Sequence, residues 1–338
     1  MTDPHSSVAP RHRTVAVRLA TLTALAAAFV CLPSNANAEE GAAEIEWSVG
    51  PASMDGPDQR ISLRHTVEPG ARVEDAIAVT NLSEAASAFT VTTGSGMVGQ
   101  EGVFDIGEPG AEGPGRWIAV GGLDGDEVTL DAGETRILPV AISVPINATP
   151  GDQPAGIAVG VSQGEGLTVT HRIGVRVHLR VAGEVTPGLT ARIVKASFTP
   201  SWIPFAPGTA TIEYEIANVG NVRLGATVAA LAAGPLGLGK AHADGEPLTE
   251  LLPGEKATRE MALRAVPIVR LNGTLAVTPV AVGNDGVRPP GPVTVALSVS
   301  ALSATGIALV IVLLAAAAIT LSRRSGRRAP RPRTADTA

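Results

Sequence analysis

Cysteine and recognisable catalytic motifs are both scarce in this 338-residue sequence. The one cysteine, Cys31, lies in an apolar segment of signal-peptide type, so a processed chain has neither disulfides nor thiolate chemistry. No Gly-x-Ser-x-Gly elbow, HExxH pair or Cys/His pairing occurs. The sequence therefore predicts a protein that is not an enzyme and that uses no cofactor or metal.

Histidine is scarce as well, and its spacing does not favour a metal site. His171 and His178 are seven positions apart on one predicted strand, so their side chains point to opposite faces and cannot share a metal ion. Carboxylates are plentiful, but the acid pair of a glycosidase needs spatial proximity that a sequence does not show. An accessory domain of a hydrolase is the remaining enzyme-related hypothesis.

Long stretches of helical period are missing from the body of the chain, where alternation dominates instead. In the segment 167–181, apolar residues take one face while Arg172, Arg176 and Arg180 share the opposite face. Short alternating segments separated by Gly, Pro, Asn and Asp are typical of antiparallel sandwiches. We therefore predict an all-β protein with two immunoglobulin-like β-sandwich domains.

The N-terminal end has the three parts of a secretory signal peptide. A basic start (11–18) precedes an apolar run (19–32), and small residues at 36 and 38 form a cleavage site. We predict that the signal peptide occupies 1–38 and that the mature chain begins near Glu39. An uncleaved anchor is the alternative.

The C-terminal end carries a second apolar run, 302–321, which contains no charge and is long enough to cross about 30 Å of hydrocarbon. An arginine cluster follows in 322–338 and predicts a cytoplasmic tail, so that the preceding domains lie outside the membrane. A buried core helix is the alternative. A sortase-type anchor needs an LPxTG-like motif, which is absent. We predict a single-pass cell-membrane protein.

Charge divides the predicted exterior into two parts. The segment 39–183 has 21 acidic and 8 basic residues, a net charge of −13, whereas 184–301 has nine of each. This asymmetry predicts a first domain at 39–183 and a second at 184–301. An acidic exterior also argues against nucleic acid as a partner.

An internal repeat favours the same division. Pro-Gly, an alternating strand and Asn-x-(Ser/Gly) occur at 69–83 and again at 207–220. Gly-Glu, a strand and Val-Pro then follow in both copies, at 133–145 and 254–267. Chance alternation in a strand-rich chain is the alternative explanation.

A Gly-rich insertion, 92–127, distinguishes the first unit, and loops of this length are often functional or mobile. Within it, 94–99 matches G-x-G-x-x-G, but no helix follows to hold a phosphate, so we predict a flexible turn. The acidic stretch 124–131 leaves calcium binding open, while its Asp-Gly favours a hairpin turn.

Four residues are the candidate contacts for a wall polymer: Trp117, Arg172, Arg176 and Arg180. The alternative for Trp117 is a plug in the hydrophobic core. The alternative for the arginines is a solvated strand face that balances acidic neighbours. Nearby, we expect 144–160 to connect two strands, with a reversal at Pro150-Gly151 and a new strand from Ile157.

The segments 45–91 and 133–160 resemble the first domain of the bacterial WxL-interacting protein family. An aromatic-containing start, a Pro-Gly turn and a strand ending in Asn-x-Ser carry the resemblance, followed by Gly-Glu, Val-Pro, Pro-Gly and Gly-Ile. The resemblance implies a peptidoglycan-binding first domain. It also implies a second domain that engages a host or matrix protein, and association with WxL-type surface proteins.

Together these features predict a membrane-anchored cell-surface protein that binds peptidoglycan or another wall polymer through its first domain. A surface protein is the expected partner of the second domain. The alternative is a structural spacer or an assembly subunit that binds a protein partner by strand-edge pairing.

Overall fold

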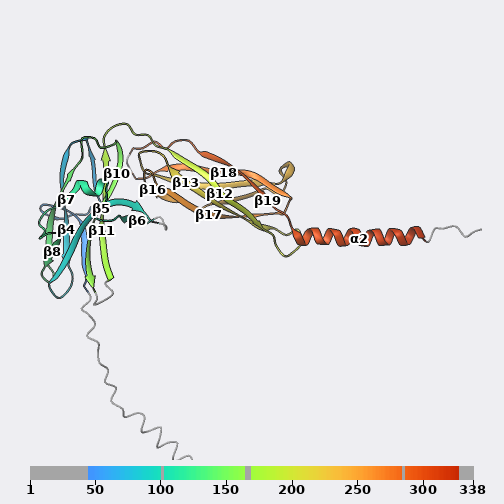
Figure 1. The fold of residues 1–338 in the computed structure, drawn as a ribbon, viewed down its shortest axis with the longest axis horizontal. Helices are drawn as coiled ribbons and strands as arrows, with labels where there is room; N and C mark the ends of the chain where they lie inside the picture. The colour runs from blue at the N-terminus through green and yellow to red at the C-terminus, as the bar shows by residue number, and fades with distance from the viewer. Residues whose placement is uncertain (1–44, 100–102, 164–168, 284–285, 327–338) are drawn as a thin grey trace, which may run out of the picture. The chain divides into compact units, whose positions relative to one another are not determined.

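Strands form nearly all of the regular structure, and one apolar helix follows them (Figure 1). The computed structural model describes residues 45–99, 103–163, 169–283 and 286–326. The contacts from Ile45 onward make one compact unit. The prediction of an all-β chain with two immunoglobulin-like sandwiches and one C-terminal helix is confirmed. The predicted signal peptide and residues 327–338 of the predicted tail lie outside the described residues.

The first sandwich has two sheets, of order β2-β1-β4-β9-β7 and β3-β11-β10-β5-β6, with β8 beside β5. The strands of its first sheet are β1 (Trp47–Ser53), β2 (Gly56–Pro57), β4 (Arg72–Asn81), β7 (Ile118–Val120) and β9 (Thr135–Ser143). Those of its second sheet are β3 (Leu63–Val67), β5 (Ser87–Val98), β6 (Phe104–Ile106), β8 (Glu127–Leu130), β10 (Gly151–Gln163) and β11 (Val169–Val181). β3 runs parallel to β11. A 3-10 helix, η1 (Pro114–Trp117), precedes β7.

The second sandwich has a sheet of order β12-β13-β17 and a sheet of order β15-β14-β18-β19, with β16 beside β14. Its strands are β12 (Leu189–Thr199), β13 (Gly208–Asn218), β14 (Leu224–Ala233), β15 (Ala241–Asp244), β16 (Leu248–Leu251), β17 (Lys256–Ala265), β18 (Arg270–Ala281) and β19 (Val293–Ser300). A second 3-10 helix, η2 (Pro235–Gly237), lies between β14 and β15.

Alternation along the strands builds the two cores. In β11, Val175, Val177 and Leu179 are buried between the sheets, whereas Arg176 is only half-buried on the other face. Burying one such apolar side chain stabilises the fold by about 1.5–3 kcal/mol. One core draws on residues between Leu63 and Val181, and the other on residues between Leu189 and Ala301. The division into domains at 183 and 184 stays a prediction.

The connection after β9 differs from its prediction. The chain turns at 146–147, and β10 begins at Gly151 instead of Ile157. Pro154 is tolerated inside β10 because β5 pairs with β10 only from Ala155 to Gly160, and no other described strand pairs with the preceding residues on that side. A proline therefore does not end the strand here.

The prediction of a flexible turn at 94–99 is wrong, because β5 continues as a strand to Val98. The glycines serve close packing instead. A Cβ atom at Gly94 would lie 2.4 Å from the carbonyl oxygen of Gly107, and one at Gly96 would lie 2.5 Å from the Phe104 ring. Glycine in this strand thus lets the chain that contains β6 lie against β5.

The predicted repeat is confirmed by two buried asparagines that make matching hydrogen bonds. Asn81 Nδ2 donates to the carbonyl oxygens of Ala85 and Leu130, at 2.8 and 3.1 Å. Asn218 Nδ2 donates to the corresponding oxygens of Val222 and Leu251, at 2.8 and 2.9 Å. In both copies the side-chain oxygen accepts an N–H two residues later, at 3.0 Å.

The C-terminal helix α2 spans Ala304–Gly326, so it begins two residues later than predicted and continues past the predicted end at 321. Its segment Ala304–Arg324 has a mean hydropathy of 2.6 and is long and apolar enough to cross a membrane. Arg323 and Arg324 are part of its last turns. The hydroxyl of Ser303 caps its first turn by accepting the N–H of Gly306, at 3.0 Å.

Candidate functional site

The three arginines predicted on β11 each pair with a carboxylate. Arg172 contacts Asp105 at 2.8 Å, Arg176 contacts Glu250 at 2.6 Å and Arg180 contacts Asp152 at 2.7 Å. Only the pair at Arg172 is well exposed. The arrangement matches the hypothesis of a strand face balanced by acidic neighbours, and the role of these arginines in binding a wall polymer stays a prediction.

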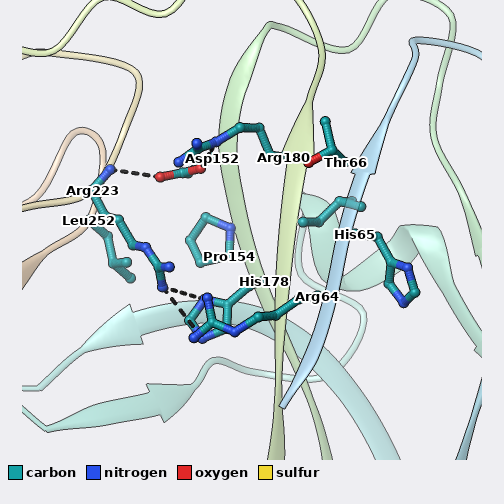
Figure 2. A pocket seen from close by; sticks show the side chains of 10 residues that line it. Arg64, His65, Thr66, Asp152, Pro154, His178, Arg180, Arg223 and Leu252 are labelled. Carbon is teal, nitrogen blue, oxygen red and sulfur yellow. Dashed lines mark hydrogen bonds and ion pairs between the residues drawn. The ribbon is translucent and has the colours of Figure 1, made fainter. Parts of the chain in front are cut away.

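A cavity of about 330 Å³ lies beside this stripe, between strands of the first sandwich and loops of the second (Figure 2). Asp152 is its central acid. One carboxylate oxygen accepts from Arg180 Nε at 2.7 Å, and the other accepts the backbone N–H of Arg223 at 2.8 Å. The backbone N–H of Asp152 also donates to the carbonyl oxygen of Asn221, at 2.7 Å. We call this contact region the junction.

Glu250 of β16 is the second acid of the junction and lies between two guanidinium groups. Its Oε2 contacts Arg176 at 2.6 Å and its Oε1 contacts Arg223 at 3.3 Å. The side chains of Arg223 and Glu250 are 5% and 11% exposed, so these charges are almost fully removed from water. Arg176 also stacks on Phe104, with its guanidinium carbon 3.9 Å from the ring centre. These ion pairs link β11 of the first sandwich to β16 and Arg223 of the second.

His178 completes the junction (Figure 2). Its Nδ1 lies 2.5 Å from Nη1 of Arg223. A guanidinium only donates, so the imidazole is the acceptor in this contact. His171, in contrast, lies on an exposed stretch of β11. The two histidines thus lie in different surroundings, as their spacing indicates.

The first half of β11 is an uncovered strand edge. β10 pairs with β11 along Val169–Val181, but β3 pairs only with Val177–Val181. Among the described residues, no strand lies beside 169–176 on the side of β3. Ile173, whose parity places it with the core residues of β11, is 40% exposed there. The backbone edge of this segment and the side chain of Ile173 are therefore accessible to an added strand.

Trp117 lies at the end of η1 and packs against the core of the first sandwich, as the core-plug alternative states. It also lines an open cavity of about 640 Å³. The polar side chains that share this cavity are Glu112, Arg116, Asn147 and Thr149. Trp117 therefore has both an apolar contact with the core and a polar neighbourhood on its accessible side.

A buried acid that sequence patterns did not indicate lies between the two sheets of the first sandwich. The carboxylate of Asp75 contacts Arg60 Nη2 at 2.8 Å and His65 Nε2 at 2.7 Å. The Oγ of the buried Ser62 has no hydrogen-bond partner in the described structure, so His65 and Asp75 do not activate it as a nucleophile. Asp75 lies within the alternating strand β4, and strand parity alone does not identify an ion pair.

Asp75 is expected to make stability depend on pH. Burial raises the pKa of Asp75, but hydrogen bonds from Arg60, the Ala76 N–H and His65 outweigh burial, so its pKa is lowered. The stabilisation is therefore complete above the unfolded-state pKa, about 4, and is lost as pH falls through the lower folded-state value.

Asp75→Asn should accordingly reduce the free energy of unfolding at pH 7 by about 1–3 kcal/mol, because Arg60 and His65 lose their charged acceptor. It should also flatten the acid-side loss of stability. Urea unfolding between pH 7 and pH 3 measures both effects, with the exposed Asp55→Asn as a matched control. Parallel pH profiles for Asp75→Asn and wild type would contradict this role.

No group of three or more His, Cys, Asp or Glu residues that could hold a metal is present within the described residues. Asp124 and Glu127 form an antiparallel bridge with Gly125 at a positive φ of 67°, which confirms the predicted hairpin turn. A Cβ atom would be strained at this φ, so glycine suits the position.

Comparison with known proteins gives weak structural similarities only. No family model and no curated protein sequence matches the chain. A chaperone–tip adhesin complex of CFA/I fimbriae has 8% identity and a TM-score of 0.39 over 74% of this chain and 98% of that one. The class 5 fimbriae chaperone CfaA has 10% identity and a TM-score of 0.38, over 74% of this chain and 98% of that one. A Salmonella enterica SafA pilin–SafB chaperone complex has 11% identity and a TM-score of 0.34, over 76% of this chain and 98% of that one. Similarity at this level supplies no evidence on what this chain binds.

Proposed function

We propose that this chain is a non-enzymatic, membrane-anchored surface protein that binds a protein partner through the uncovered edge of β11. The N-terminal signal and the arginines at and beyond the end of α2 support an exported orientation. The observation that carries the proposal is the edge at 169–176, where, among the described residues, β11 has a neighbouring strand on one side only. An extended partner segment would satisfy the free backbone groups and cover Ile173.

The chemistry of this edge favours an extended peptide over a small ligand. Backbone hydrogen bonds of an added strand supply affinity, at about 0.5–1.5 kcal/mol each. Side chains on alternate positions supply selectivity. Ile173 offers an apolar contact on one face, while Arg172, paired with the exposed Asp105, offers a charge on the other. A partner strand with an apolar residue opposite Ile173 fits both features.

Site-specific photocrosslinking in cells tests the proposal. A photoreactive residue at His171 or Ile173 should yield one discrete crosslinked protein, whereas the same residue at Met54, exposed in the first sandwich, should not. Adding Ile173→Asp to the His171 reporter should remove the crosslink, because an uncompensated carboxylate would enter the apolar contact. Equal labelling at Met54 and at the edge would contradict strand addition.

A wall polymer is the second candidate ligand, and the cavity at Trp117 favours it. An indole face with acidic, basic, amide and hydroxyl groups around it suits a sugar ring with an anionic substituent. Sedimentation of the detergent-solubilised chain with isolated walls tests this candidate. Arg116→Ala and Asn147→Ala should leave more protein in the supernatant than the exposed control Arg72→Ala does. Equal supernatant fractions for all three variants would exclude the cavity as a wall site.

A further inference from the structure

The end of the second sandwich that joins α2 carries a set of exposed apolar side chains. They come from three separate loops, and we call them the apolar rim: Trp202, Ile203, Phe205, Leu236, Leu238 and Val269. Trp202 is 82% exposed and Leu236 is 99% exposed. Exposed apolar clusters of this kind mark surfaces for proteins or membranes, because water alone does not favour them.

Contacts connect these loops with the start of the helix. The Phe205 ring lies close to Gly306 of α2, since a Cβ atom on that glycine would be 2.8 Å from the ring. The backbone N–H of Ala301 donates to the carbonyl oxygen of Val269, at 3.0 Å. A Cβ atom on Gly234 would lie 3.0 Å from the Ile268 side chain. The loop that contains η2 therefore packs against the loop that contains Val269. The rim thus belongs to the part of the sandwich from which the helix leaves.

Backbone strain is concentrated in the same loops. Within the described residues, three non-glycine residues have positive φ: Phe205 at 59°, Leu236 at 57° and Val269 at 43°. A β-branched residue rarely adopts this conformation. Strained backbone of this kind persists only where the surrounding structure enforces it, and it clusters at functional sites. All three side chains are exposed, so burial in the core does not explain the strain.

The length of the connection places this end close to the membrane surface. β19 ends at Ser300 and α2 begins at Ala304, so three residues separate the sandwich from the helix. Three residues span at most about 10 Å. Because Ala304–Arg324 is the segment suited to cross the bilayer, the rim cannot be far from the headgroup region when α2 is inserted.

The charge of the loops also suits a lipid surface. The segments 200–207, 234–240, 266–270 and 301–303 contain no acidic residue, and their charged residues are Lys240 and Arg270. Both of these side chains are exposed. Cations beside an apolar rim attract anionic lipid headgroups, while tryptophan is favoured at the boundary between headgroups and acyl chains.

We propose that the apolar rim inserts into the interfacial region of the bilayer and docks the second sandwich on the membrane surface. This inference rests on the proposed membrane anchor and is independent of the partner strand at β11. Insertion would remove the rim from water and would fix the distance of the second sandwich from the bilayer.

A single-cysteine series tests the docking in the full chain. With Cys31→Ser in every variant, one engineered cysteine carries an environment-sensitive fluorophore: Leu236→Cys in the rim, Met54→Cys in the first sandwich, or Leu313→Cys in α2. Each protein is reconstituted into phosphatidylcholine–phosphatidylglycerol vesicles, with or without brominated acyl chains. The probe at 236 should emit at shorter wavelength than the probe at 54 and lose intensity to brominated lipid.

The three positions distinguish the possible failures. If the probe at 313 is quenched but the probes at 236 and 54 behave alike, the anchor stands and the docking is overturned. If the probe at 313 is not quenched either, the membrane anchor fails and the docking fails with it. If the shift at 236 disappears on dilution of protein in lipid and bromine has no effect, a second copy covers the rim and the proposal is wrong.

Discussion

Glu250→Ala is expected to lower the free energy of unfolding by about 3–5 kcal/mol, because removing one partner of a buried ion pair leaves an uncompensated charge. Two guanidinium groups, those of Arg176 and Arg223, lose their shared acceptor at once. Within the described part of the chain, the Nε atom of Arg176 is already buried without a hydrogen-bond partner. Little water is available at the junction to replace the carboxylate, since the side chain of Glu250 is only 11% exposed.

Urea unfolding of the detergent-solubilised chain, followed by far-ultraviolet circular dichroism, measures this loss. The exposed Glu260→Ala, on β17 of the same sandwich, should change the midpoint little. Adding Arg223→Met to Glu250→Ala should restore part of the stability, because an apolar side chain of similar length removes one of the two buried charges that faced Glu250. A midpoint for Glu250→Ala equal to that of Glu260→Ala would show that the junction charges are not coupled as the distances indicate.

Strand alternation allowed the fold class and the core residues to be predicted from the sequence. In β9, Leu138, Val140 and Ile142 are buried and Pro139 is exposed, as their parity predicts. Alternation is readable because a strand with one face in a core repeats every two residues. The Asn-x-(Ser/Gly) repeat was readable for a similar reason, since a short fixed motif performs the same hydrogen bonding in both units.

Strand ends and long-range partners were harder to predict from the sequence. Gly151 begins β10 although a proline follows three residues later, because the pairing of β10 with β5 starts only beyond that proline. Arg176 and Glu250 are 74 residues apart, so their pairing depends on the packing of two sandwiches and leaves no local pattern. The uncovered edge of β11 likewise depends on where β3 stops, which strand propensity does not specify.

Asn81→Ala and Asn218→Ala should each lower the free energy of unfolding by about 2–4 kcal/mol, because each removes a buried side-chain amide that donates to backbone carbonyl oxygens. Asn81 is 0% exposed and Asn218 is 2% exposed. Each side chain ties the end of its strand to the turn after it and to the chain before the Gly-Glu turn. Thermal and urea unfolding of the two variants should therefore give similar losses.

Asn218→Asp separates this hydrogen-bond role from simple space filling. Aspartate has nearly the same shape and can still accept the Gly220 N–H, but it presents an oxygen to the carbonyl oxygens of Val222 and Leu251. If donation matters, Asn218→Asp at pH 7 should be at least as destabilising as Asn218→Ala, and the exposed Asn272→Ala should be mild. A milder effect of aspartate than of alanine would mean that these asparagines fill space and that the matching hydrogen bonds contribute little.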